Sequence, residues 1–168
     1  QEFVARRMLS GETVVDLSSP KKPKPKPEWQ TAIQKVAPGF NVRNVGEGGV
    51  VQHEAFRNAK AVQTHPLNKK KASSLHRTVE IPKGKKTTLQ MRVSHHPHGD
   101  WQLRVLADGK MIENQLVSSK SVGDDEWMEL SVDLTPYAGT KIRLSIENHP
   151  NNWMNEWAYW NKVAIISE

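Results

Sequence analysis

The sequence contains no cysteine, which excludes disulfide bonds, thiolate metal sites and cysteine nucleophiles. No apolar run approaches the roughly 20 residues that a membrane-spanning helix needs, so no membrane span is expected. The chain begins at Gln1 rather than Met and carries no signal-peptide pattern. We therefore expect a processed protein or a piece of a longer one, with an upstream domain of the same parent protein as one partner.

Catalytic motifs are also missing from the sequence. It has no Gly-rich phosphate loop, no nucleophile elbow and no HExxH zinc motif. The acidic run Asp124-Asp125-Glu126 is contiguous, without the second carboxylate across a cleft that glycoside hydrolysis needs. We expect a protein that is not an enzyme. The alternative is a metal-dependent hydrolase built on HHPHGD, residues 95–100, in which at least three His and carboxylate side chains would meet.

Apolar residues are scarce and positive charge is abundant. Hydrophobic residues make up 36% of the chain, below the about 45–50% of typical globular proteins. The net charge of +6 favours anionic partners, which include nucleic acids, anionic membrane surfaces and acidic or sulfated glycans. Aromatic residues are not interleaved with the lysine runs as they are in stacking sites for single strands, so no nucleic acid is expected.

Proline and lysine alternate in PKKPKPKP, from Pro20 to Pro27, which predicts an extended polyproline II linker. The alternative is a basic arm that binds an anionic surface. We divide the chain into an N-terminal segment with this linker, residues 1–28, and a folded module, residues 29–168. Trp29, Ile33 and Val36 share one helical face ahead of a Pro-Gly pair, which predicts one short helix.

From residue 40 onward the hydrophobic pattern has period 2, which indicates β-strands with one buried face. Trp101 and Trp127 stand at strand starts and are expected in the core. Turn sequences such as Asp108-Gly109 separate the runs, so the module is predicted to be an all-β, antiparallel sandwich or barrel. The expected strands are 40–45, 50–56, 61–64, 75–81, 87–94, 101–106, 111–117, 127–134, 141–147 and 158–166.

If each strand crosses the sandwich once, successive loops alternate between its two ends. One end then receives the short turns PKGK, ADGK and TPYAGT. The other receives four long polar loops, residues 65–74, 95–100, 118–126 and 148–156. Loops on a rigid scaffold commonly carry function, so the long-loop end is the predicted binding end.

The long-loop end offers chemistry for glycans and for metal ions. Carbohydrate binding needs an aromatic face and hydrogen-bonding groups. The predicted ligand-binding residues are Trp153 for stacking and Asn151, Asn152, His149, Asn155, His96 and His98 for polar contacts. The predicted metal ligands are Asp124, Asp125 and Glu126, with Ca²⁺ as the candidate ion, and the His cluster offers a second metal-binding alternative. A solvated loop end without a ligand is the remaining alternative.

Three segments resemble one family. These are GDWQLRVLADGKMI (99–112), DEWMELSVDLTPYAGTKIRLSIEN (125–148) and EWAYWNKVAI (156–165). Together they look like the galactose-binding-like jelly-roll superfamily, which includes carbohydrate-binding modules and NPCBM-like accessory domains of secreted bacterial proteins. The resemblance implies a jelly roll of about eight strands, usually non-catalytic, often with a structural Ca²⁺ and a glycan at the loop end. In VDLTPYAG, Asp133 is expected to bond the backbone of the following turn.

We expect a non-catalytic, carbohydrate-binding-like accessory module of an exported bacterial protein, located in the periplasm, at the cell surface or outside the cell. Its partner would be a polysaccharide or glycan, including anionic ones. The alternative is a structural or protein-interaction domain that packs on a parent enzyme and binds no glycan. That alternative predicts a contiguous apolar patch on a sheet face.

Overall fold

The computed structural model describes residues 24–168. The predicted N-terminal segment and the first half of the predicted linker, residues 20–23, lie outside the described residues. The described residues form α2 (Pro27–Val36), β1 (Asn41–Arg43), β2 (Val51–Phe56), β3 (Ala59–Thr64), β4 (Ser73–Glu80), β5 (Thr87–His95), β6 (Trp101–Ala107), β7 (Lys110–Val117), β8 (Met128–Asp133), the 3₁₀ helix η1 (Thr135–Tyr137), β9 (Lys141–His149) and β10 (Ala158–Ser167). Every expected strand is present, shifted by at most a few residues.

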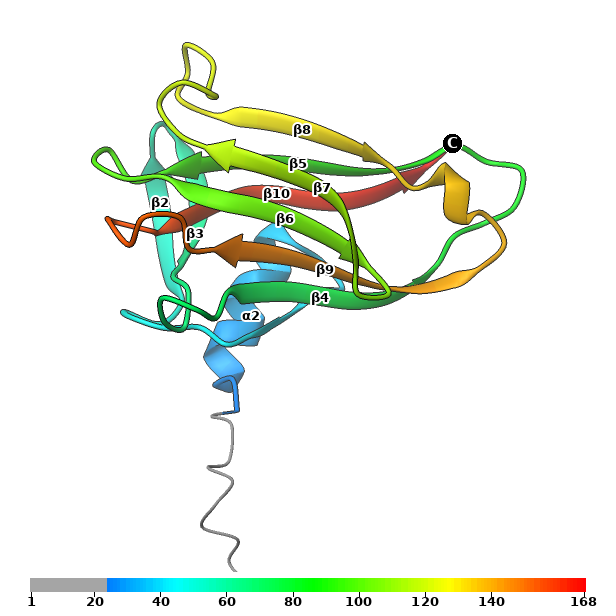
Figure 1. Cartoon of the computed structure of the whole chain (residues 1–168), viewed down its shortest axis with the longest axis horizontal. Helices are drawn as coiled ribbons and strands as arrows, with labels where there is room; N and C mark the ends of the chain where they lie inside the picture. Colours follow the sequence, from blue (N-terminus) through cyan, green and yellow to red (C-terminus); the bar gives the residue numbers. More distant parts are fainter. Residues whose placement is uncertain (1–23) are drawn as a thin grey trace, which may run out of the picture.

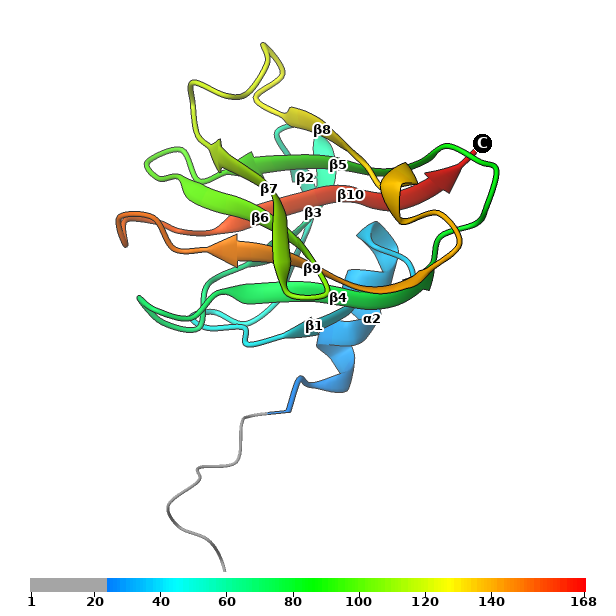
Figure 2. The same ribbon diagram turned by 45° about the vertical axis from the view of Figure 1, so that its right-hand side comes forward.

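The strands form two five-stranded sheets that lie face to face (Figures 1 and 2). Sheet A has the order β1-β4-β9-β6-β7, and sheet B has the order β2-β3-β10-β5-β8. Every neighbouring pair of strands is antiparallel. The predicted antiparallel sandwich is confirmed. The longest ladders, β10 with β5 and β4 with β9, place strands far apart in sequence side by side.

Inward-facing side chains from both sheets fill the space between them. In β6, Trp101, Leu103 and Val105 are buried while their neighbours are only half-buried. The Trp101 ring lies 5.2 Å from that of Trp160, centroid to centroid, and both rings are fully buried. Such a ring removes about 150–250 Å² of surface from water, so this pair anchors the core. Trp127 is buried as predicted, in a smaller cluster on sheet B.

Helix α2 closes the sandwich beside the edge strand β1 (Figure 2). Its amphipathic face buries Ile33 and Val36 in the main core, and Trp29 packs against the same core. Gln30 reaches across to β1, where its Oε1 accepts from the Val42 N–H and its Nε2 donates to the Val42 carbonyl oxygen. The helix begins at Pro27, two residues earlier than expected, because proline suits the first helical turn.

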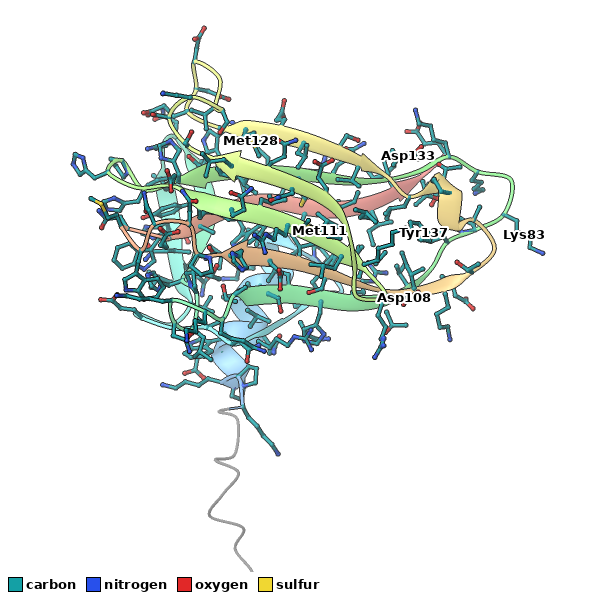
Figure 3. The ribbon with its side chains drawn as sticks, in the orientation of Figure 1. Lys83, Asp108, Met111, Met128, Asp133 and Tyr137 are labelled. Carbon is teal, nitrogen blue, oxygen red and sulfur yellow. The ribbon has the colours of Figure 1, made fainter. Side chains whose placement is uncertain are left out.

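The loops sort to the two ends as the strand count predicts (Figure 1). Lys83, Asp108, Asp133 and Tyr137 lie at the end with the short turns (Figure 3). There, Asp133 Oδ1 accepts a hydrogen bond from the Thr135 N–H at 3.0 Å, which confirms its predicted role in the turn. The opposite end carries the β3–β4, β5–β6, β7–β8 and β9–β10 loops and is called the loop end below.

Candidate functional site

One buried carboxylate organises the β9–β10 loop, residues 150–157. Glu156 has no exposed surface, and its Oε2 accepts a hydrogen bond from the Asn151 N–H at 2.8 Å. Its Oε1 accepts from the N–H groups of Asn152 and Met154, at 3.0 and 3.2 Å. Three backbone donors of the loop are satisfied in this way. The loop therefore wraps around its own side chain and presents residues 151–154 to solvent.

Trp153 stands at the tip of this loop with about a third of its surface exposed (36%). Its backbone φ is +61°, in the left-handed region that side chains other than glycine rarely adopt. Such a conformation costs on the order of 1–3 kcal/mol and persists only where surrounding contacts enforce it. Here the three bonds to Glu156 do so. The loop backbone therefore presents the indole at the surface, where it lies against the His65 ring.

Trp153 begins an aromatic row, defined as Trp153, His65, Trp157, His96 and His98. The His65 ring lies 5.1 Å from Trp153 and 4.9 Å from Trp157, centroid to centroid. His96 lies 5.6 Å from Trp157 and 5.9 Å from His98. The row thus joins three loops at one end of the sandwich. Its middle, His65 and Trp157, is largely covered, and its two ends, Trp153 and His98, are exposed.

Hydrogen bonds determine which role Nδ1 has in two of these histidines, His65 and His96. His65 Nδ1 lies 2.8 Å from the Pro66 carbonyl oxygen, which can only accept, so Nδ1 carries a proton and donates it. At the exposed end, the His98 N–H donates to His96 Nδ1 at 3.1 Å. Partial burial lowers the pKa of His96 below its ordinary value, and the nearby charges of His98, His95 and Arg57 lower it further. His96 therefore stays neutral at pH 7 and can accept or donate hydrogen bonds.

Two of the three predicted amides join loops to one another. Asn151 Nδ2 donates to Asp100 Oδ1 at 2.8 Å, and Asn155 Nδ2 donates to the His98 carbonyl oxygen at 3.2 Å. Asn152 Oδ1 accepts from the Met154 N–H within its own loop. The structure therefore brings Trp153, the three amides, His96 and His98 together, but it engages part of each amide in holding the loops.

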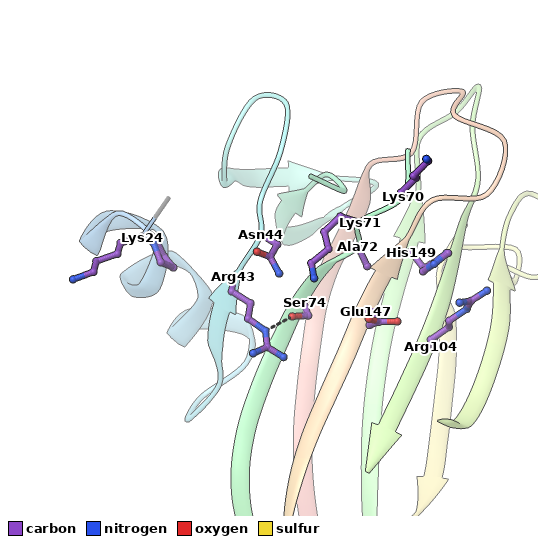
Figure 4. A pocket seen from close by; sticks show the side chains of 11 residues that line it. Lys24, Arg43, Asn44, Lys70, Lys71, Ala72, Ser74, Arg104, Glu147 and His149 are labelled. Atoms are coloured by element: carbon purple, nitrogen blue, oxygen red, sulfur yellow. Dashed lines mark hydrogen bonds between the residues drawn. The ribbon is translucent and has the colours of Figure 1, made fainter. Parts of the chain in front are cut away.

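His149 lies apart from this group. It is the last residue of β9 and points to the outer face of sheet A, where it borders a hollow of about 580 Å³ (Figure 4). Its Nδ1 lies 2.9 Å from the Pro150 carbonyl oxygen. The sequence analysis assigns His149 to the loop, but β9 continues two residues further than expected, and strand alternation then turns its side chain outward.

The acidic run of the β7–β8 loop lies at the same end, over Arg57 and Arg92. Asp125 pairs with Arg92 at 3.0 Å, and it also accepts from the Trp127 N–H. That backbone bond, followed by the bond from Arg92, lowers the pKa of Asp125 below its ordinary value. The Glu126 carboxylate lies 3.7 Å from Arg57. Within residues 24–168, no three His, Asp or Glu side chains converge as metal ligands would. The calcium site at Asp124, Asp125 and Glu126 stays a prediction.

Sequence reasoning missed two residues that build the loop end, Trp157 in the aromatic row and Glu156 in the β9–β10 loop. Trp157 precedes β10 and looks like a core residue, yet its ring lies between His65 and His96, and its Nε1 is buried without a hydrogen-bond partner among the described residues. Glu156 looks like one more loop carboxylate. A sequence feature that could have identified both residues is their position directly before the strong strand pattern of β10. Loop residues at such a position pack against the sandwich.

Comparison with known proteins was informative only at the level of structure. No family model matches the sequence, and no curated protein matches it. The CBM22-1 xylan-binding domain from Paenibacillus barcinonensis superposes with a TM-score of 0.52 and 12% identity, over 81% of this chain and 90% of that chain. The K1 cleaved adhesin domain of Lys-gingipain from Porphyromonas gingivalis gives 0.53 and 11%, over 79% and 93%.

The fold is a galactose-binding-like jelly roll. The predicted fold class is thereby confirmed; the described residues form ten strands, as the hydrophobic pattern predicts, where the resemblance alone implies about eight. A galactose-binding-like sandwich carries many kinds of binding surface, so its ligand has to be argued from the side chains at the loop end and on the sheet faces. Among residues 24–168, no helix is long and apolar enough to cross a membrane.

Proposed function

We propose that the protein is a non-catalytic carbohydrate-binding module that binds a glycan at the loop end. The observation that carries the proposal is the exposed Trp153 ring, held in a left-handed backbone conformation by the buried Glu156. An indole has a flat apolar face and a polar edge, which suits the apolar face of a pyranose ring. A ring fixed before binding loses little conformational entropy on binding.

Polar groups beside Trp153 supply contacts for sugar hydroxyls. Asn152 and Asn155 lie in the same loop as Trp153, and His98 lies at the exposed far end of the aromatic row. Amides both donate and accept hydrogen bonds, and an imidazole ring offers N–H donors, as hydroxyl recognition requires. The proposal includes export from a bacterial cell, since the matched solved domains include a xylan-binding domain and an adhesin domain.

The test is a binding titration with neutral oligosaccharides of xylan, galactan and glucan type. Binding is measured by calorimetry and by tryptophan fluorescence. We expect one of these oligosaccharides to bind the unmodified protein. Trp153→Ala is expected to weaken that binding about five- to tenfold, because loss of an aromatic contact removes roughly 1–1.5 kcal/mol. Repeating the titration with Ca²⁺ and with a chelator tests the acidic run of the β7–β8 loop as a calcium site.

The matched control is Met154→Ala, which removes the most exposed apolar side chain of the same loop (61% exposed) and leaves the indole in place. Binding by this variant should equal that of the unmodified protein. Equal binding by Trp153→Ala would contradict the proposed site. Absence of binding to every neutral and acidic saccharide would contradict the proposed function.

A second candidate is a domain that docks on a protein partner. Met111 and Leu116 favour it, because both are exposed on the outer face of the edge strand β7 (50% and 38% exposed). Asn114, which faces Arg104 across the ladder, separates them, so the apolar surface is interrupted. Protection of β7 from hydrogen exchange in the longer parent protein, but not in the isolated module, would support this candidate.

A further inference from the structure

Two hollows adjoin each other on the outer face of sheet A. The first has a volume of about 580 Å³ and the second about 320 Å³, and both are bordered by Arg43 and Glu147. The hollow near the loop end is called the sheet groove, and it is defined by Arg43, Lys70, Lys71, Arg104, Glu147 and His149 (Figure 4). Trp153 does not border it.

The strand register builds the floor of the sheet groove. Arg43 of β1 faces Ser74 of β4, Ser74 faces Glu147 of β9, and Glu147 faces Arg104 of β6. Their sequence neighbours Val42, Leu75, Ile146 and Val105 are buried in the core, so alternation turns this row outward. Lys70 and Lys71 project from the β3–β4 loop above the row (Figure 4).

Positive charge dominates this surface. Four of its six defining residues are Lys or Arg, and Glu147 is the one carboxylate among them. Among the described residues, none of these four cations belongs to an ion pair. Arg43 donates from Nε to Ser74 Oγ at 3.1 Å, and Arg104 Nε is buried without a hydrogen-bond partner. Cations without a carboxylate partner favour a ligand that brings negative charge.

We propose that the sheet groove binds an acidic saccharide, with Arg43, Arg104 and the two lysines on its carboxylate or sulfate groups. Arginine forks match the two oxygens of such anions. Glu147 and Ser74 on the floor accept hydrogen bonds from sugar hydroxyls. This inference rests on the proposed function in taking the ligand to be a saccharide, and it adds the ligand's charge and a second binding surface.

The lining favours a saccharide over a nucleic acid. Stacking of bases needs aromatic rings along the groove, and its rings are imidazoles alone, His149 at one end and His76 in the adjoining hollow. Glu147 in the middle of the floor would repel a phosphodiester chain. An acidic sugar, in contrast, presents hydroxyl donors between its charges, which a carboxylate flanked by arginines can accept.

The test uses three hexasaccharides with the full chain: a heparin fragment, a galacturonic acid hexamer and a neutral galactan fragment. We expect the heparin or the galacturonate probe to bind more tightly than the neutral one, which also separates sulfate from carboxylate recognition. Arg43→Gln/Arg104→Gln should weaken that binding at least about tenfold, since each charge-assisted bond contributes substantially. Its salt dependence should also become shallower. Lys70→Gln/Lys71→Gln, on the loop, provides a second variant with an intact sheet.

Lys83→Gln/Lys85→Gln is the matched control, because it removes two charges from exposed residues at the short-turn end. Its affinity for acidic probes should stay unchanged. Equal losses in groove and control variants, or equally tight binding of a single-stranded DNA hexamer, would overturn the inference. If a neutral saccharide binds through Trp153 while the groove variants leave all binding unchanged, this inference fails and the proposed function stands. If no saccharide of any charge binds, both fail.

Discussion

The β9–β10 loop and the β7–β8 loop are both long, polar and acidic, and both lie at the loop end, yet they are held in opposite ways. In the first, Glu156 is fully buried and binds three backbone N–H groups of its own loop. In the second, the acidic side chains lie at the surface, and it is the Glu126 carbonyl oxygen that accepts bonds from Ser94 and Arg57. The buried Glu156 thus holds three backbone donors of its loop, whereas the exposed Asp125 holds one, the Trp127 N–H.

The largest effect expected from this difference follows Glu156→Gln. The amide NH₂ of the variant would face at least one of the three N–H donors, which leaves buried donors unpaired. We expect a loss of about 2–3 kcal/mol in the free energy of unfolding. Thermal unfolding should show the midpoint falling by roughly 10 °C for a domain of this size.

The control for Glu156 is Asp124→Asn in the β7–β8 loop, where the side chain is exposed. Its unfolding midpoint should match that of the unmodified protein, because exposed substitutions usually change stability by less than about 0.5 kcal/mol. Equal midpoints for both variants would show that the buried carboxylate does not organise its loop.

The second effect concerns the anchor of the β7–β8 loop, which is a cation. Arg57 is almost buried (9% of its side chain exposed), and its Nη1 donates to Ser94 Oγ at 2.8 Å and to the Glu126 carbonyl oxygen at 3.1 Å. Arg57→Gln should lower the free energy of unfolding by about 1–2 kcal/mol, because both acceptors lose a charged donor.

Chemical denaturation measures the Arg57 effect, with Lys60→Gln as its control. Lys60 pairs with Glu54 at 3.9 Å, but both side chains are about four-fifths exposed (80% and 82%). Such surface pairs contribute little, so its unfolding curve should not shift. If Arg57→Gln shifts the curve no more than Lys60→Gln, Arg57 is not the anchor of the loop.

Strand alternation was enough to predict the inner half of this molecule. Trp101, Leu103 and Val105 alternate with polar residues, and only one face of such a strand can be buried. Counting strands then placed the four long loops at one end, because each strand reverses the chain. Neither step requires knowing which strands are neighbours.

The functional surfaces depend on information that this reasoning does not contain. The sheet groove joins Arg43, Glu147 and Arg104, which are distant in sequence and meet only through the order β1-β4-β9-β6. Extending the alternating pattern of β9 by two residues predicts an outward-facing His149. The end of that strand could not be predicted, however, because the residues there are polar and show no hydrophobic alternation. The burial of Glu156 depends on a loop conformation with positive φ at Trp153 and Asn155, which no residue pattern dictates.

The smallest effect expected is a pH dependence of the free energy of unfolding, to which His96 of the β5–β6 loop contributes. His96 lies against Trp157 of the β9–β10 loop, while His95, His98 and Arg57 contribute the charges around it. Because the folded-state pKa of His96 is lowered, the unfolded chain binds more protons below the ordinary pKa of 6.5. Stability is therefore complete above that value and decreases as the pH falls below it, toward the lower folded-state pKa.

Unfolding midpoints at a series of pH values from neutral to mildly acidic should decrease in the unmodified protein, and the decrease should be smaller in His96→Gln. Burial and Arg43 also lower the pKa of His76, on the outer face of sheet A. His76 therefore contributes to the same decrease of the unfolding midpoint with falling pH, and His76→Gln removes that contribution. Asp125 acts in the same direction but at more acidic pH, because its lowered pKa lies below the ordinary carboxyl value of 3.8. An unchanged slope in His96→Gln, with a reduced slope in His76→Gln, would assign the acid sensitivity to the sheet face and leave the loop end insensitive to pH.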